Sequence, residues 1–134
     1  MLGSKNEFFK QKPHILEKAK IDIVEILNFK SRSQNDINKY IEAFNYFVDN
    51  PTRYDGATIV KDLIDLRIGK EYLDLDAMLH DYVYITGANK SFIKKWKADL
   101  DYIQNMEKNG KGIRVFRFFI LTILGIVFVP YKKI

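Results

Sequence analysis

The stretch DLDAMLHDYVYITGANKSFIKKWKADLDYIQNMEKN, residues 74–109, decides the fold. Asp74 can cap a helix that ends near Gly87. A second helix begins after Asn89 or Ser91 and runs to the end of the stretch. The residues expected to face inward recur at helical spacing, and they are Leu75, Met78, Leu79, Tyr82 and Ile85 in the first helix and Phe92, Trp96, Leu100, Ile103 and Met106 in the second. Because the connecting loop is short, the two helices are expected to pack antiparallel.

Two segments upstream of the hairpin have mixed patterns. Residues 13–29 are predicted to form a helix, because Pro13 suits a first helical position and apolar residues follow at near-helical spacing. Alternation over residues 21–25 also fits a short strand. Residues 58–68 fit either a helical stripe or an extended segment, with a break at Gly69.

A clearer helix follows Ser33. Ser33 and Asp36 stand three residues apart, as in a capping box, and apolar residues then recur on one helix face over residues 37–48. Asn50-Pro51 is expected to end this helix, and residues 51–57 are predicted to form a loop.

Length and composition predict a single domain, which the helical patterns above make mainly α-helical. The chain has 134 residues, of which 47% are hydrophobic and 29% charged, enough for one buried core. The absence of cysteine excludes disulfides, thiolate metal sites and cysteine nucleophiles. Residues 1–57 are expected to form an N-terminal helical region, and residues 58–134 a helical core with an apolar C-terminal helix. Residues 1–7 lack the apolar core of a secretory signal, so no signal peptide is expected.

Basic and apolar residues gather in the last third of the chain. Residues 1–89 have a net charge of −2, whereas residues 90–134 have a net charge of +7 and include the uncharged run 118–129. This pairing favours a membrane surface over nucleic acid. Residues 112–129 are expected to form a nearly all-apolar helix. Since spanning a bilayer takes about 20 apolar residues, segment 115–131 is marginal as a transmembrane helix, and a buried or interfacial helix remains open.

The flanks of this apolar run supply the candidate contacts to a membrane or to a protein partner. These residues are Arg114, Arg117, Phe118, Phe119, Lys132 and Lys133. Long basic side chains at such flanks can reach lipid phosphates while their stems stay apolar.

The hairpin also carries the residues whose side chains suit catalysis. His80 and Tyr84 share one helix face, and Asp99 lies across the turn from His80 in an antiparallel hairpin. A carboxylate that accepts the proton of one imidazole nitrogen leaves the other nitrogen free to act as a general base. Asp81 could hold a hard cation such as Ca²⁺, which would polarise an ester carbonyl.

Each candidate also has a structural interpretation. His80 could be a histidine whose hydrogen bonding is satisfied by Asp76 or Asp99, without catalysis. His14 has no cluster of ligands nearby and is interpreted as structural. Four aspartates could crowd together and bind a cation, although alternating charges are more typical of a solvated face; they are Asp62, Asp65, Asp74 and Asp76.

The hairpin motifs resemble those of phospholipases A2. His80–Tyr84 matches the HDxxY signature, and Ala98–Ile103 is similar to the ADxxF/YI element of the compact viral members carried on capsid proteins. The resemblance, which extends to small phage and prophage proteins, covers residues 72–131. It implies a phospholipase A2-like helical hairpin and calcium-dependent hydrolysis of a phospholipid ester during entry. The implied setting is a virion or a host-cell membrane, with a phospholipid surface and capsid or other virion proteins as partners.

The resemblance also implies roles for individual residues. His80 would be the general base, Asp99 would orient it, Asp81 would bind calcium, and Tyr84 would support the pair through a hydrogen bond. The sequence departs from the family pattern in one respect. The Y-x-G-x-G calcium loop is missing, and the nearest substitutes are Tyr54-Asp55-Gly56 and Gly69.

This departure keeps a second hypothesis open. The chain could be a non-enzymatic virion structural protein, or a membrane-associated one, that retains the helical scaffold. A nucleic-acid binder rests on net charge alone.

Overall fold

The computed structural model describes residues 6–54 and 63–111, and this part of the chain is mainly helical. The helices are α1 (Pro13–Phe29), α2 (Gln34–Asp49), α3 (Leu75–Thr86) and α4 (Phe92–Lys108). Short 3₁₀ turns are η2 (Phe8–Lys10), η3 (Pro51–Arg53) and η5 (Ala88–Lys90), and the strands are β1 (Leu66–Ile68) and β2 (Glu71–Leu73).

Side-chain caps fix where three helices begin. The hydroxyl of Ser33 accepts a hydrogen bond from the backbone N–H of Asp36, and the hydroxyl of Ser91 accepts one from Lys94. The carboxylate of Asp74 accepts from two backbone N–H groups at the start of α3. Because the first N–H groups of a helix have no partner within the helix, such caps determine its first residue.

A two-stranded hairpin connects the first helical pair to the second. β1 pairs antiparallel with β2, and Leu66 lies opposite Leu73. The chain reverses at Gly69, whose φ of +59° lies in the left-handed region that favours glycine. The side-chain amide of Asn6 donates to the carbonyl of Tyr72 at 2.7 Å, so the segment before η2 is tied to this hairpin.

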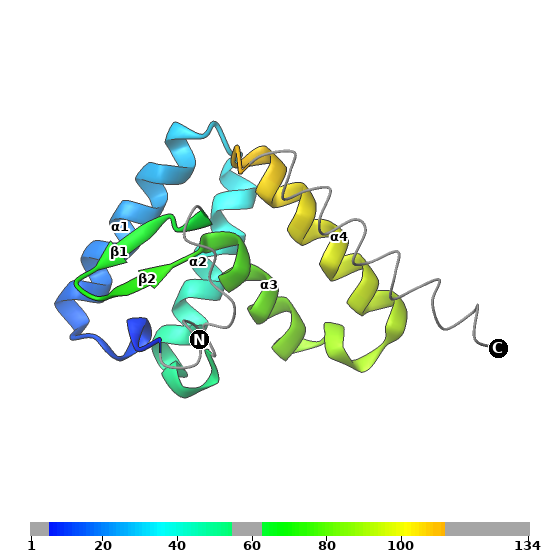
Figure 1. Ribbon diagram of the computed structural model, residues 1–134, viewed down its shortest axis with the longest axis horizontal. Helices are drawn as coiled ribbons and strands as arrows, with labels where there is room; N and C mark the ends of the chain where they lie inside the picture. Colours follow the sequence, from blue (N-terminus) through cyan, green and yellow to red (C-terminus); the bar gives the residue numbers. More distant parts are fainter. Residues whose placement is uncertain (1–5, 55–62, 112–134) are drawn as a thin grey trace.

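The helices follow one another in space as they do in the sequence. α1 packs against α2, α2 against α3, and α3 against α4. Figure 1 shows α4 running from the turn after α3 back to the connection between α1 and α2. There the ammonium of Lys30 donates to the carbonyl of Asn109, which closes the arrangement.

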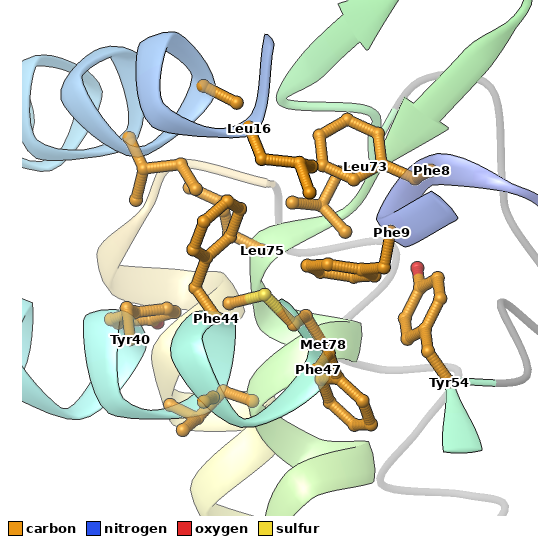
Figure 2. Packing of buried hydrophobic residues seen from close by; sticks show 14 of the residues in the cluster. Phe8, Phe9, Leu16, Tyr40, Phe44, Phe47, Tyr54, Leu73, Leu75 and Met78 are labelled. Atoms are coloured by element: carbon orange, nitrogen blue, oxygen red, sulfur yellow. The ribbon is translucent and has the colours of Figure 1, made fainter. Parts of the chain in front are cut away.

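The core joins aromatic residues from distant parts of the chain (Figure 2). Phe9 of η2 meets Phe44 of α2 edge-to-face, with ring centroids 5.3 Å apart. Tyr54 packs against Phe9 in the same way at 4.8 Å. The members of the core with no more than 1% exposure include Phe8, Ile23, Leu27, Tyr40, Phe44, Phe47, Leu73, Leu75 and Met78. This cluster holds α3 against α2 and so fixes the base of the α3–α4 hairpin.

Most sequence predictions for the described residues are confirmed. Residues 13–29 form a helix and not a strand, the helix after Ser33 ends at Asn50, and the ambiguous segment is extended at 66–68. The inward orientation of two residues is wrong, because Phe92 is 62% exposed and Trp96 40% exposed. Periodicity identified their helix, but no described element covers the start of α4.

The C-terminal predictions lie outside the described residues. These concern the apolar helix at 112–129, the marginal span 115–131 and the candidate contacts from Arg114 to Lys133. Among the helices that are described, none has the length and apolar character needed to cross a bilayer.

Replacing Phe44 by alanine should cost most of the stability of the domain. Phe44 is 1% exposed in the aromatic core, and a buried Phe→Ala change removes about 3–5 kcal/mol from the free energy of unfolding. Phe29→Ala is the matched control, since Phe29 is 90% exposed. Urea unfolding followed by circular dichroism checks both variants, and equal losses would contradict this placement of the core.

Candidate functional site

A histidine–aspartate pair connects the two helices of the hairpin. Nε2 of His80 on α3 lies 2.7 Å from Oδ1 of Asp99 on α4. The hydroxyl of Tyr84, one turn after His80, donates to the same oxygen at 2.9 Å. The side chains of His80 and Asp99 are 23% and 21% exposed, so solvent reaches the pair without surrounding it. The expected juxtaposition of these three residues is therefore present.

Two tyrosine rings hold the imidazole in place. The ring of His80 packs against that of Tyr84 with centroids 4.4 Å apart, and against that of Tyr102 at 4.8 Å. Burial and the hydrogen bond to Asp99 raise the pKa of Tyr84, so its hydroxyl keeps its proton and remains a donor. Asp99 consequently receives two hydrogen bonds on one oxygen, which restricts the orientation of His80.

His80 also lines a cleft of about 560 Å³ between α2, α3 and α4. Tyr40 and Asp76 contribute to the same cleft from α2 and α3, and Tyr102 contributes from α4. Three exposed lysines stand on the cleft wall, namely Lys39, Lys97 and Lys108. The histidine is therefore accessible from a cleft whose lining combines these lysines with the acidic side chains of Asp36, Glu42 and Asp101.

A buried polar network lies behind the cleft. Arg32 donates to the Asn109 side-chain oxygen at 2.6 Å and to that of Asn105 at 2.8 Å. The amide of Asn109 and the hydroxyl of Tyr40 both donate to Asp76, at 2.9 and 2.6 Å. This network joins the start of α2 to the end of α4. This network could not be predicted from the sequence, because nothing in the local pattern marks Asn109 as buried.

The strongest charge cluster is centred on Lys111, just after α4. Its ammonium lies 2.7 Å from a carboxylate oxygen of Asp65, 2.7 Å from one of Asp74 and 2.8 Å from one of Asp76. All four side chains are 6% exposed or less. The expectation of a solvated acidic face is wrong for these three aspartates, because the fold buries them around the ammonium of Lys111. Asp62 lies outside the described residues.

Electrostatics within this cluster follow from burial and pairing. Burial lowers the pKa of Lys111, but the three carboxylates outweigh it and hold that pKa above its ordinary value. Burial raises the pKa of Asp74, opposed by the ammonium of Lys111. The lysine therefore stays charged. The buried cluster thus contains three carboxyl groups and a single ammonium group.

The described residues do not fit a calcium ion at this cluster. Asp65, Asp74 and Asp76 are the one group of three acidic or other ligating side chains in residues 6–54 and 63–111 close enough to share an ion. Calcium takes six to eight oxygen ligands, and here the ammonium already occupies the centre. Asp81, the residue proposed from the sequence, is half-buried on α3 outside this group, and its role stays a prediction.

Comparisons with known proteins add no relatives. The chain matches no protein-family model, and neither the curated proteins nor the solved structures contain a significant match.

Replacing Lys111 by methionine should destabilise the fold by about 3–5 kcal/mol, because removing one partner leaves buried carboxylates without their counter-charge. The loss should shrink as the pH is lowered and the carboxyls take up protons. Lys18→Met is the control, since Lys18 pairs with Asp22 on the surface and its side chain is 78% exposed. Urea unfolding at several pH values measures both, and a Lys111 variant as stable as the parent chain would contradict the cluster.

Stability should also fall at alkaline pH. Donation to Glu42, followed by burial, raises the pKa of Tyr82 to about 12, and burial raises the pKa values of Tyr40, Tyr84 and Tyr102 as the largest cause for each. Because each folded-state pKa lies above the ordinary value, the contribution of these tyrosines to the free energy of unfolding is intact below pH 10. It is lost as the pH rises toward 12 and beyond. Urea unfolding between pH 9 and 11, with tyrosinate absorbance, tests this prediction. Ionisation of all eight tyrosines near pH 10 in the folded chain would contradict it.

Proposed function

We propose that the chain is a phospholipase A2-like hydrolase that cleaves a phospholipid ester with His80 as general base. The observation that carries the proposal is the contact between Nε2 of His80 and Asp99, with Tyr84 donating to the same carboxylate oxygen. The resemblance of the HDxxY and ADxxY motifs supplies the substrate class, and it places the reaction at a virion or host-cell membrane during entry.

The chemistry follows from the tautomer that this contact favours. Asp99 accepts a hydrogen bond from the protonated Nε2, so Nδ1 carries the lone pair. Nδ1 would take a proton from a water molecule as its oxygen bonds to the ester carbonyl carbon. The resulting imidazolium, stabilised by Asp99, would then return the proton to the leaving alcohol as the ester C–O bond breaks. His80 is thus the catalytic residue, and Asp99 and Tyr84 are positioning residues.

The surroundings of His80 suit a phosphate-bearing ester. The cleft that contains His80 also carries the exposed ammonium groups of Lys39, Lys97 and Lys108. Each ammonium group would attract a lipid phosphate locally, beside the carboxylates of Asp36, Glu42 and Asp101 in the same cleft. The calcium implied by the family would polarise the ester carbonyl, but the one group of three neighbouring acidic side chains among the described residues already holds the ammonium of Lys111.

A second function is favoured by the charge cluster. The three aspartates that come close enough to share a cation hold an ammonium instead, and the contacts of His80 with Asp99 and two tyrosine rings also join the two helices of the hairpin. These observations support a non-enzymatic structural protein of a virion or membrane, in which His80 and Asp99 join two helices.

Hydrolysis separates the two functions. Purified full-length chain should release fatty acid from mixed phospholipid vesicles, and His80→Ala should lower the rate by about a thousandfold or more, because the general base is lost. Asp99→Asn and Tyr84→Phe should lower kcat and alter its pH profile, since both act on the orientation and protonation of His80. Assays with calcium and with a chelator show whether the ion is required.

His14→Ala is the matched control, because it removes an exposed histidine of α1. This variant should keep the parent rate. Circular dichroism and thermal unfolding establish that each variant is folded. A folded parent chain without hydrolysis under either calcium condition would reject the enzyme and support the structural protein.

A further inference from the structure

The tip of the α3–α4 hairpin, residues 82–98, presents large apolar side chains to solvent. Phe92 is 62% exposed, Ile93 74% and Trp96 40%. All three lie in the first turns of α4, directly after η5. Figure 1 shows this turn at the edge of the molecule, on the side away from α1 and the β1–β2 hairpin. Single exposed apolar residues are ordinary, but three neighbours on one helix end form a patch that needs an explanation.

The three side chains belong to one face of α4. Phe92 and Trp96 are four residues apart, and Ile93 and Trp96 are three apart, so the members of both pairs are neighbours on the helix surface. No described element covers this face, although it continues toward Ile103, which is 1% exposed deeper in the hairpin. The apolar stripe thus runs from the interior out to the exposed tip.

The charge of the tip has one sign. Between Asp81 and Asp99 the sequence contains four lysines and no acidic residue. The lysines are Lys90, Lys94, Lys95 and Lys97, and all are exposed. None of them makes an ion pair with another described residue, and so their charge is available to an external partner.

We propose that the hairpin tip docks on an anionic lipid surface, with Phe92, Ile93 and Trp96 entering the boundary between headgroups and acyl chains. The lysines would contact lipid phosphates and carboxylates around them. A helix end with aromatic and aliphatic residues beside lysines has the composition of interfacial membrane contacts. A nucleic acid would use stacking and cationic contacts, in which the aliphatic side chain of Ile93 has no part.

The docking surface would also bring the proposed active site to its substrate. This one consequence rests on the proposed function, whereas the docking itself does not. Asp99 lies three residues after Trp96 on α4, less than one helical turn further along. His80 meets Asp99 at 2.7 Å from the facing helix. A tip seated in the headgroup layer would therefore hold the His80–Asp99 pair beside the ester bonds of the lipids. These contacts would be made by α4 itself, whatever the segment after residue 111 does.

Trp96 allows a direct test, because it is the only tryptophan of the chain. Full-length protein is titrated with vesicles of phosphatidylcholine containing phosphatidylglycerol, and with vesicles of phosphatidylcholine alone, in the presence of a chelator. The emission of Trp96 should shift to shorter wavelength with the anionic vesicles, and brominated lipids should quench it. Sedimentation with the vesicles gives the partition coefficient.

Two variants test the two halves of the surface. The triple change Phe92→Ser, Ile93→Ser and Trp96→Ser should lower partitioning by about tenfold or more. The triple change Lys94→Gln, Lys95→Gln and Lys97→Gln leaves Trp96 in place and should lower it by about a hundredfold. The pair Ile21→Ser and Phe29→Ser is the control, since these apolar side chains of α1 are 60% and 90% exposed and should not matter.

The outcomes are distinct. Unchanged vesicle binding by both tip variants would overturn the proposal. A shift of Trp96 emission that occurs without lipid and depends on protein concentration would also overturn it, in favour of a second copy of the chain bound at the tip. A change in Trp96 emission on addition of single-stranded RNA, but not on addition of vesicles, would overturn the proposal in favour of nucleic acid. The His80→Ala variant should bind as tightly as the parent chain. A parent chain that binds the vesicles but hydrolyses no lipid would reject the enzyme and leave the docking surface standing.

Discussion

The ammonium of Lys111 among three buried carboxylates is the interaction on which the rest of the structure depends. Asp65 precedes β1, Asp74 caps α3 and Asp76 lies in its first turn, whereas Lys111 follows α4. A single charge therefore ties both ends of the α3–α4 unit to the strand hairpin. Because unpaired charges in a buried environment cost several kcal/mol each, the three carboxylates can lie together only while Lys111 is in place.

That cluster sets the register of the two helices. At one end Asp76 of α3 accepts from Asn109, and further along α3 His80 meets Asp99 from earlier in α4. Each step forward along α3 thus corresponds to a step backward along α4, as an antiparallel pair requires. The contact between Asp76 and Asn109 and the contact between His80 and Asp99 are therefore consistent with one antiparallel register.

The hairpin has two ends with opposite character. Its base is dry and polar, where Arg32, Asn109 and Asp76 satisfy one another. Its tip is exposed and combines apolar side chains with unneutralised lysines. Between them His80 opens on the cleft. If the proposed docking holds, a buried base, an imidazole on a cleft and an exposed tip would suit chemistry at a surface, and they would equally suit a scaffold that only binds there.

The sequence by itself determined the helices and the meeting of His80 with Asp99. Caps at Ser33 and Asp74, together with helical periodicity, act over a few residues, and a short loop leaves two helices one way to pack. Only the tertiary structure decided the partner of Lys111, which lies 46 residues from Asp65, and the exposure of Trp96. A periodic pattern says which residues share a face, but whether another element covers that face, and which charges meet beneath it, depends on how distant segments pack.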